Sequence, residues 1–446
     1  MYKQIAKLIL YGDIPRDSVL YEMGEIFRRF DTLPEDDSGE RTDLIRQIYH
    51  TTKHLLTVAT DYGFDRNLWH NYLSYFFIVN ENPFSITCEK TGAHDGSVND
   101  FAMHDFAQFY ELFFYDFAPI EEALSIDCFS RICDYHAIRK NERMYNQNVS
   151  EKVQALAAQL ETAQSPEDFF GFVTGFYKDF GVGMFGINKA FRIEPAAAGG
   201  VRFLPINNMD TVRLSDLVGY EIQKKKLIDN TKAFVEGKKA NNVLLFGDSG
   251  TGKSTSIKAI VNEFYPQGLR MIEIYKHQFR ELSNLIAAIK HRNYKFVIYM
   301  DDLSFEDFEV EYKFLKAVIE GGVETRPDNI LIYATSNRRH LIHEPWKDRD
   351  DMERGPGGMH RSDTMQEKLS LVNRFGVTIY YGKPSQKEYV DIVAHLAAKE
   401  GLQIDEKTLF AEANKWELSH GGISGRTAQQ FVNYLAGFSD SSGDRM

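Results

Sequence analysis

The sequence has few cysteines and no long apolar run. Its three cysteines, Cys88, Cys128 and Cys133, are too few for a disulfide framework, which indicates a reducing compartment. Cys128, Cys133 and His136 fit no common zinc spacing, so we interpret the thiols as buried side chains. No stretch approaches the ~18 apolar residues of a membrane-spanning helix, and the N-terminus lacks the apolar core of a signal peptide. We therefore expect a cytoplasmic protein without a membrane partner.

The sequence also has fewer basic than acidic residues. The 52 lysines and arginines are outnumbered by 64 aspartates and glutamates, which leaves a formal net charge of -12. This balance argues against a protein that coats nucleic acid through bulk electrostatics, although it does not exclude a local basic patch. With 446 residues, the chain is too long for one ordinary core and is expected to divide into two or three domains.

Residues 1–200 are expected to form a mostly α-helical N-terminal domain with a partner-binding or regulatory role. Apolar residues recur there at helical spacing, as at Leu44, Ile48 and Leu55. The aromatic cluster within residues 101–117 also has the spacing of a buried helix, so we interpret it as core rather than as a ligand site. This half shows no catalytic constellation.

The rest of the chain predicts an α/β domain followed by helices. Residues 195–200, Pro-Ala-Ala-Ala-Gly-Gly, are small and carry no apolar periodicity, which is typical of a joint between domains. In residues 201–382, short apolar runs alternate with helical stretches, which predicts a parallel sheet with helices on both faces and a ligand site at the carboxyl ends of its strands. Residues 383–446 contain three helical stretches and are expected to form a small C-terminal lid.

A phosphate-binding loop is predicted where an apolar strand runs into a glycine-rich turn and then a helix. Its residues are Gly247, Asp248, Ser249, Gly250, Thr251, Gly252, Lys253, Ser254 and Thr255. In this pattern the backbone N–H groups surround phosphates, a solvent-facing Lys253 places its charge between the β- and γ-phosphates, and Ser254 offers a hydroxyl to Mg²⁺. The upstream residues Leu217, Val218 and Gly219 are expected to cover the adenine face. The sequence therefore predicts that ATP and Mg²⁺ bind here.

Acidic and amide side chains follow two later apolar strands. Phe296–Met300 runs into Asp301 and Asp302, at the place where a phosphate-loop enzyme needs carboxylates. We assign Asp301 to the metal and Asp302 to the role of general base, with Glu306 as the second choice for the base. Asn337 follows the next strand and is a candidate for holding the attacking water.

Two arginines and one charged segment complete the set of candidates. Arg374 stands at a predicted helix end just before the last strand, and Arg426 opens the last helical stretch. Residues 343–364 are highly charged and broken by proline and glycine, which predicts a solvated loop that is either mobile or engaged with a partner.

These motifs resemble the AAA+ ATPases in order and spacing over residues 211–438. In that family, the corresponding elements are Walker A, Walker B, sensor 1, the arginine finger and sensor 2, here at 247–254, 296–302, Asn337, Arg374 and Arg426. The resemblance implies an α/β P-loop core with a five-stranded parallel sheet and a small helical lid. It also implies a homo-oligomer in which Arg374 reaches a neighbour's γ-phosphate, while Arg426 reports the nucleotide state within its own subunit.

The whole chain also looks like bacterial ATP-binding proteins grouped as a domain of unknown function, in which a helical N-terminal region precedes one AAA+ module. The phrases at residues 79–84, 185–191 and 301–306 carry this match. One departure is that the usual Asp-Glu of Walker B is Asp-Asp here. Because the acid at the base position is one methylene shorter, slow turnover is consistent with the sequence.

Two functions follow from these expectations. In the first, an oligomeric ATPase remodels or loads a protein partner through its N-terminal domain. In the alternative, the chain is a nucleotide-switched binding module with little intrinsic hydrolysis. The acidic balance counts against a third interpretation, in which the ATPase is linked to DNA.

Overall fold

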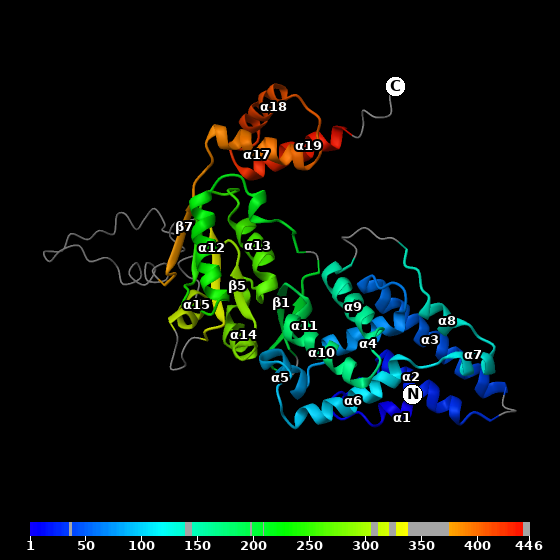
Figure 1. The fold of residues 1–446 in the computed structure, drawn as a ribbon. Helices are drawn as coiled ribbons and strands as arrows, with labels where there is room; N and C mark the ends of the chain where they lie inside the picture. The colour runs from blue at the N-terminus through cyan, green and yellow to red at the C-terminus, as the bar shows by residue number, and fades with distance from the viewer. Residues whose placement is uncertain are drawn as a thin grey trace, which may run out of the picture. The chain divides into compact units, whose positions relative to one another are not determined.

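The computed structural model describes residues 1–34, 38–138, 145–196, 199–207, 209–304, 311–320, 327–337 and 374–439. It divides the chain into two compact units, residues 1–188 and residues 189–446 (Figure 1). No helix among the described residues is long and apolar enough to span a membrane.

The described part of the first unit is built of helices, joined by loops and one isolated β-bridge between Arg66 and Tyr135. Its helices are α1 (Tyr2–Ile5), α2 (Val19–Asp31), α3 (Ser38–Tyr62), α4 (Leu68–Val79), α5 (Pro83–Thr91), α6 (Val98–Phe113), α7 (Ala118–Leu124), α8 (Cys128–Cys133), α9 (Gln147–Leu160), α10 (Pro166–Phe180) and α11 (Gly183–Ile187). Short polar side chains start several of them; Ser18, for example, accepts a hydrogen bond from the Tyr21 N–H at the start of α2.

Aromatic side chains form much of the core of this unit. Phe106, Phe109 and Phe113 are buried, as the helical spacing predicted, whereas Phe101 and Phe114 from the same cluster are largely exposed. The cysteines are free, with Cys88 and Cys128 buried and Cys133 partly buried. The described residues contain no group of three or more histidine, cysteine, aspartate or glutamate side chains that could hold a metal ion.

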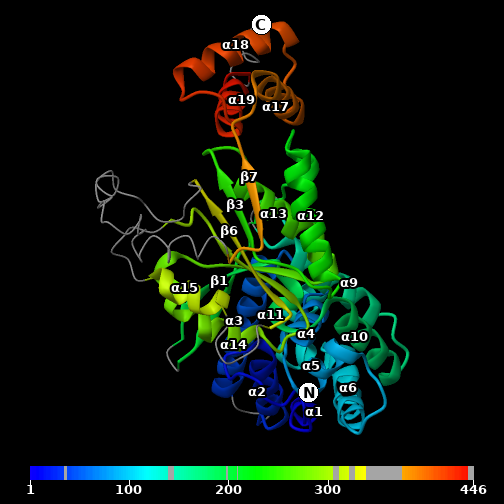
Figure 2. The same ribbon diagram turned by 90° about the vertical axis from the view of Figure 1, so that its left-hand side faces the viewer.

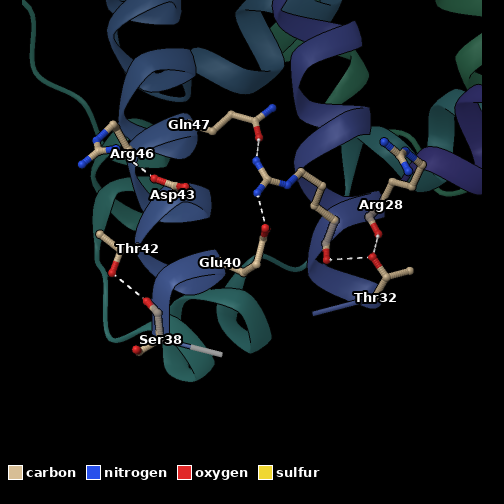
Figure 3. Close-up of polar contacts among 9 residues, drawn as sticks. Arg28, Thr32, Ser38, Glu40, Thr42, Asp43, Arg46 and Gln47 are labelled. Atoms are coloured by element: carbon tan, nitrogen blue, oxygen red, sulfur yellow. Dashed lines mark hydrogen bonds and ion pairs between the residues drawn. The ribbon is translucent and has the colours of Figure 1, made fainter. Parts of the chain in front are cut away.

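Polar contacts fasten the helices of this unit to one another and to the N-terminal segment. On the surface, Arg29 of α2 donates to Glu40 and Gln47 of α3, at 2.7 and 2.9 Å (Figure 3). In the interior, the fully buried Asp105 of α6 accepts hydrogen bonds from the N–H groups of residues 9–11 at 2.8 to 3.1 Å. Asp105 thereby satisfies three backbone donors of an irregular segment that make no ladder or helix bond.

The second unit is built on a seven-stranded sheet in the order β2-β1-β4-β5-β6-β3-β7 (Figures 1 and 2). Its strands are β1 (Ala190–Pro195), β2 (Val201–Pro205), β3 (Val243–Gly247), β4 (Leu269–Glu273), β5 (Lys295–Met300), β6 (Ile330–Ser336) and β7 (Val377–Tyr381). All neighbours pair in parallel except β1 and β2, which form an antiparallel hairpin.

The five strands predicted from the sequence are β3 to β7, and the fold class is confirmed. The expected count of five strands was incomplete, because the β1–β2 hairpin extends the sheet along β4. Residues 195–200 therefore connect two strands of the hairpin and are not a joint between domains. The boundary between the units falls after Asn188 instead of near residue 200.

Helices cover both faces of the sheet, as Figure 2 shows. They are α12 (Glu221–Val235) and α13 (Lys253–Phe264) on one face, and α14 (Leu282–Ile289) and α15 (Glu311–Glu320) on the other. Alternate residues of the central strands, such as Val243 and Leu245 of β3, pack with Leu227 and Ile257 of the first pair of helices. Burial on both faces explains why β3, β5 and β6 are continuous apolar runs.

The lid follows β7 and consists of α17 (Gln386–Lys399), α18 (Glu406–Ser419) and α19 (Gly425–Ser439). It has its own small core, in which Tyr389 and Val393 of α17 pack with Ala413 of α18 and Phe431 of α19. A capping box between Ser385 and Glu388 starts α17. Three helical stretches were predicted here, and three helices form.

Replacing Asp105 by alanine is expected to destabilise the first unit by about 3 kcal/mol, because buried N–H groups at residues 9–11 would lose their acceptor. Asp105→Asn keeps one acceptor oxygen and should lose about half as much. Chemical denaturation of the full chain measures this change. The control is Asp61→Ala, which removes an exposed carboxylate that makes no hydrogen bond among the described residues. Equal stability of the Asp105 and Asp61 variants would contradict the anchoring role.

Candidate functional site

The predicted phosphate loop, residues 247–254, turns between the end of β3 and the start of α13. Gly247, Gly250 and Gly252 have φ angles of 134°, 75° and 88°, which side chains other than glycine's rarely allow. At Gly247 the reason is also steric, because an added Cβ would lie 2.1 Å from the carbonyl oxygen of Tyr381 at the end of β7. The glycine therefore lets the loop pass directly over the neighbouring strand.

Lys253 lies inside this loop. Its ammonium donates to the carbonyls of Gly247 (3.1 Å) and Asp248 (2.6 Å) and to Asn337 Oδ1 (3.0 Å). The residue is only 6% exposed, which corrects the expectation of a solvent-facing lysine. Burial lowers the pKa of Lys253, and the nearby carboxylates of Asp302, Asp248 and Asp301 oppose that shift. A partly desolvated ammonium at the start of a helix is well suited to an anion.

Asp301 lies against the first turn of α13. Its Oδ1 accepts hydrogen bonds from Ser254 Oγ at 2.7 Å and from Thr335 Oγ1 at 2.6 Å. Burial alone would raise the pKa of Asp301, but hydrogen bonds, including those from the Thr335 and Ser254 hydroxyls, outweigh burial, so the pKa lies below its ordinary value. The carboxylate is therefore held ionised beside a serine hydroxyl.

Asp302 and Asn337 also meet at this edge of the sheet. Asn337 Nδ2 donates to Asp302 Oδ1 at 2.8 Å, while its own Oδ1 accepts from Lys253. The Asp302 N–H donates to Thr335 Oγ1 at 2.9 Å, and Asp302 has a left-handed φ of 48°. One chain of contacts thus joins the lysine, the amide and the second acid.

Strand register explains why these residues meet. In the parallel ladder, Met300 of β5 is the partner of Ala334 of β6, so the residues that follow each strand emerge side by side. Beyond the ladder, the Leu303 N–H still bonds the Thr335 carbonyl at 2.7 Å.

A cavity of about 640 Å³ extends from the phosphate loop to the lid. Ser249 to Thr255 line its phosphate end together with Asp301, Asp302 and Asn337. Further lining comes from core and lid residues, namely Asp210, Val212, Asp216, Leu217, Val218, Tyr220, Ile392, Leu396, Lys399, Gly425, Arg426 and Gln429. This volume lies in the ordinary range for small-molecule sites.

Most of the residues predicted for the site are brought together by the fold, but some are not. Gly247 and Asp248 belong to the loop without lining the cavity, and Gly219 adjoins Leu217 and Val218, which do line it. Arg374 is exposed and precedes β7, so it lies at the amino edge of the sheet, opposite the phosphate loop. Glu306 and the charged segment at 343–364 lie outside the described residues.

Sequence reasoning missed several residues of the site. Thr335, which is 2% exposed, touches both acids, yet a threonine within an apolar run is typical of any strand. Asp216 and Lys399 form an ion pair of 3.2 Å between the core and the lid. Because the two residues are far apart in sequence, no local sequence pattern predicts that they form a pair.

Comparison with solved structures gives distant similarities. The RuvB Holliday junction branch migration motor of Thermotoga maritima is 17% identical, over 52% of this chain and 67% of that chain, with a TM-score of 0.36. The FIGL-1 AAA domain in complex with ADP is 19% identical, over 52% of this chain and 76% of that chain, with a TM-score of 0.35.

Comparisons of sequence lead to a family. No curated protein is significantly similar to this chain. Residues 187–439, which cover the sheet, the phosphate loop and the lid, match the family described as "Protein of unknown function (DUF815)". The match covers more than half of the chain and agrees with the expected resemblance to proteins grouped as a domain of unknown function. The chain therefore belongs to the DUF815 family.

Proposed function

We propose that this chain binds Mg-ATP in the cavity beside the phosphate loop and hydrolyses it. The observation that carries the proposal is the meeting of Lys253, Ser254 and Asp301 at the carboxyl edge of the parallel sheet. A buried ammonium, a glycine-rich loop at the start of a helix and an ionised carboxylate next to a hydroxyl form a set that suits phosphates accompanied by a hard cation.

Ser254 and Asp301 would hold the magnesium ion. Both offer oxygen atoms, the ligands that Mg²⁺ prefers, and they are already adjacent, with 2.7 Å between Ser254 Oγ and Asp301 Oδ1. When bound, Mg²⁺ neutralises charge on the β- and γ-phosphates. The low pKa of Asp301 keeps the carboxylate available for the ion at neutral pH.

The neighbouring residues suit the remaining steps of hydrolysis. Asp302 would accept the proton of the attacking water, and the hydrogen bond from Asn337 fixes the orientation of its carboxylate. Lys253 would exchange its carbonyl contacts for phosphate oxygens. Arg426, at the lid side of the cavity, would sense the nucleotide within its own subunit.

The apolar part of the cavity lining favours a nucleotide over inorganic phosphate as the ligand. Val212, Leu217 and Val218 of the core and Ile392 and Leu396 of the lid provide apolar side chains there. A purine base can cover such side chains while its phosphates occupy the loop.

Position also supports a role for Arg374 in a homo-oligomer. In a parallel sheet, a residue that precedes β7 is a full strand length away from a loop that follows β3. Arg374 therefore cannot reach the phosphates of its own subunit, and the residue is exposed. We propose that it serves as an arginine finger in trans.

The work coupled to hydrolysis is proposed to be the remodelling or loading of a protein partner through the helical first unit. The three free thiols in that unit support a reducing compartment such as the cytoplasm. The alternative function is a nucleotide-switched binding module. Turnover distinguishes the two, since a motor should exceed ~1 per second with its partner and a switch should remain far below that rate.

Lys253→Ala is expected to weaken ATP binding by roughly a hundredfold or more, because the ammonium supplies charge-assisted hydrogen bonds to the phosphates. Calorimetry with Mg-ATP measures the affinity, and circular dichroism checks the fold. Lys258→Ala is the matched control, since Lys258 lies on the same helix but does not line the cavity. Equal affinities in both variants would remove the phosphate-loop assignment.

Asp302→Asn is expected to retain ATP and to lose hydrolysis by roughly a hundredfold, because it removes the base while keeping the hydrogen bond to Asn337. Asp301→Asn should instead weaken the Mg²⁺-dependent part of binding. Single-turnover hydrolysis and calorimetry at varied Mg²⁺ separate these effects. Normal hydrolysis by Asp302→Asn, together with inactivity of Glu306→Gln, would transfer the role of base to Glu306.

Arg374→Ala is expected to bind ATP normally but to hydrolyse it about a thousandfold more slowly, because a finger in trans stabilises charge on the transferred phosphoryl group. Mixing this variant with Lys253→Ala should restore part of the activity, since each mixed interface combines one intact loop with one intact finger. Steady-state assays across a dilution series measure the restoration. A monomer whose specific activity is independent of concentration would contradict the assembly.

A further inference from the structure

The segment that joins the sheet to the lid is held at three consecutive residues. The Tyr381 carbonyl accepts from the Asp248 N–H at 3.0 Å, and the Gly382 carbonyl accepts from the Tyr220 hydroxyl at 2.8 Å. The Lys383 N–H donates to Asp248 Oδ2, also at 3.0 Å. We call residues 381–383 the hinge. Two of these three backbone contacts come from one residue of the phosphate loop, Asp248.

Asp248 also contacts the lysine of the loop. Its carbonyl accepts hydrogen bonds from Lys253 Nζ at 2.6 Å and from Thr251 Oγ1 at 2.8 Å. The backbone of Asp248 therefore contacts the group that would bind phosphate, while its carboxylate binds the backbone of the hinge. A carboxylate in an anion-binding loop is unfavourable unless it faces away from the anion, and Asp248 does not line the cavity.

We propose that Asp248 is a positioning residue that couples nucleotide occupancy to the position of the lid, an inference that rests on the proposed binding of ATP. Phosphates compete with the Gly247 and Asp248 carbonyls for the Lys253 ammonium, so binding changes the contacts that fix Asp248. The loop and the hinge start from paired strand ends, since Gly247 of β3 is the ladder partner of Tyr381 of β7. A shift of Asp248 is therefore passed to Lys383 through a single side chain.

Among the described residues, two further polar contacts join the lid to the core, and one of them supplies the control variant for the test. The Arg426 N–H of α19 donates to the Gly250 carbonyl at 3.3 Å. At the end of α17, Lys399 pairs with Asp216 at 3.2 Å. Lys399→Gln removes this second attachment of α17 without altering the loop or the hinge. It should loosen the lid and leave the coupling intact.

Hydrogen exchange of the full chain tests the coupling, with and without saturating Mg-ATP. In the unmodified chain, nucleotide should change the exchange of the hinge and α17. In Asp248→Ala, the Lys383 amide should exchange about tenfold faster without nucleotide, because it loses an acceptor that is charged. The nucleotide-dependent change in α17 should then disappear at Mg-ATP concentrations that calorimetry shows to be saturating for this variant.

Conservative variants separate coupling from simple loss of stability. Asp248→Asn keeps an acceptor for the Lys383 N–H and should retain most of the nucleotide-dependent change, whereas Lys399→Gln should speed exchange of α17 equally with and without nucleotide. If Asp248→Ala does not fold, the test uses Asp248→Ser instead. The serine hydroxyl is one bond closer to the backbone than the carboxylate oxygens, so it is too short to reach the Lys383 N–H. A full nucleotide response in these shortened variants would overturn the coupling. Failure of the unmodified chain to bind ATP would overturn the proposed function and the coupling with it.

Discussion

The parallel pairing of β3, β5 and β6 is the constraint on which the site depends. The carboxyl ends of parallel strands lie at one edge of the sheet. Asp301, Thr335 and the phosphate loop therefore meet there although they are far apart in sequence. Ser254 and Thr335, from different elements, converge on a single oxygen of Asp301. A one-residue slip of β6 would reverse the side-chain faces and turn Thr335 away from both acids.

At the carboxyl edge of the sheet, the charged groups of the site are each balanced by a neighbouring polar or charged group. Lys253 is buried among carbonyl oxygens, and three carboxylates lie close enough to oppose the loss of its proton. Asn337 separates the lysine from Asp302 and bonds both, with its oxygen toward the ammonium and its nitrogen toward the carboxylate. Among the residues that the structure describes, Lys253 is thus held apart from the carboxylates by an amide and not in an ion pair that an incoming phosphate would have to break.

The sequence predicted those parts of the structure that have a local signal. Continuous apolar runs identified β3 to β7, and glycine spacing identified the phosphate loop. The hairpin of β1 and β2 was missed because both strands end in proline, at Pro195 and Pro205, which is unfavourable within a strand. The lid side of the cavity was largely missed, since Ile392 and Lys399 are ordinary helix residues until tertiary packing places them opposite the core.

The left-handed backbone at Asp302 has a consequence for the departure from the usual Asp-Glu pair. Among residues with a side chain, aspartate and asparagine tolerate this region best, because a short polar group can bond to nearby backbone. Asp302 is held there by Thr335, which accepts its N–H directly after the strand ends. The turn itself thus favours the shorter acid, so the identity of this residue reflects conformational preference as well as chemistry, and a glutamate here would gain reach at the expense of backbone strain.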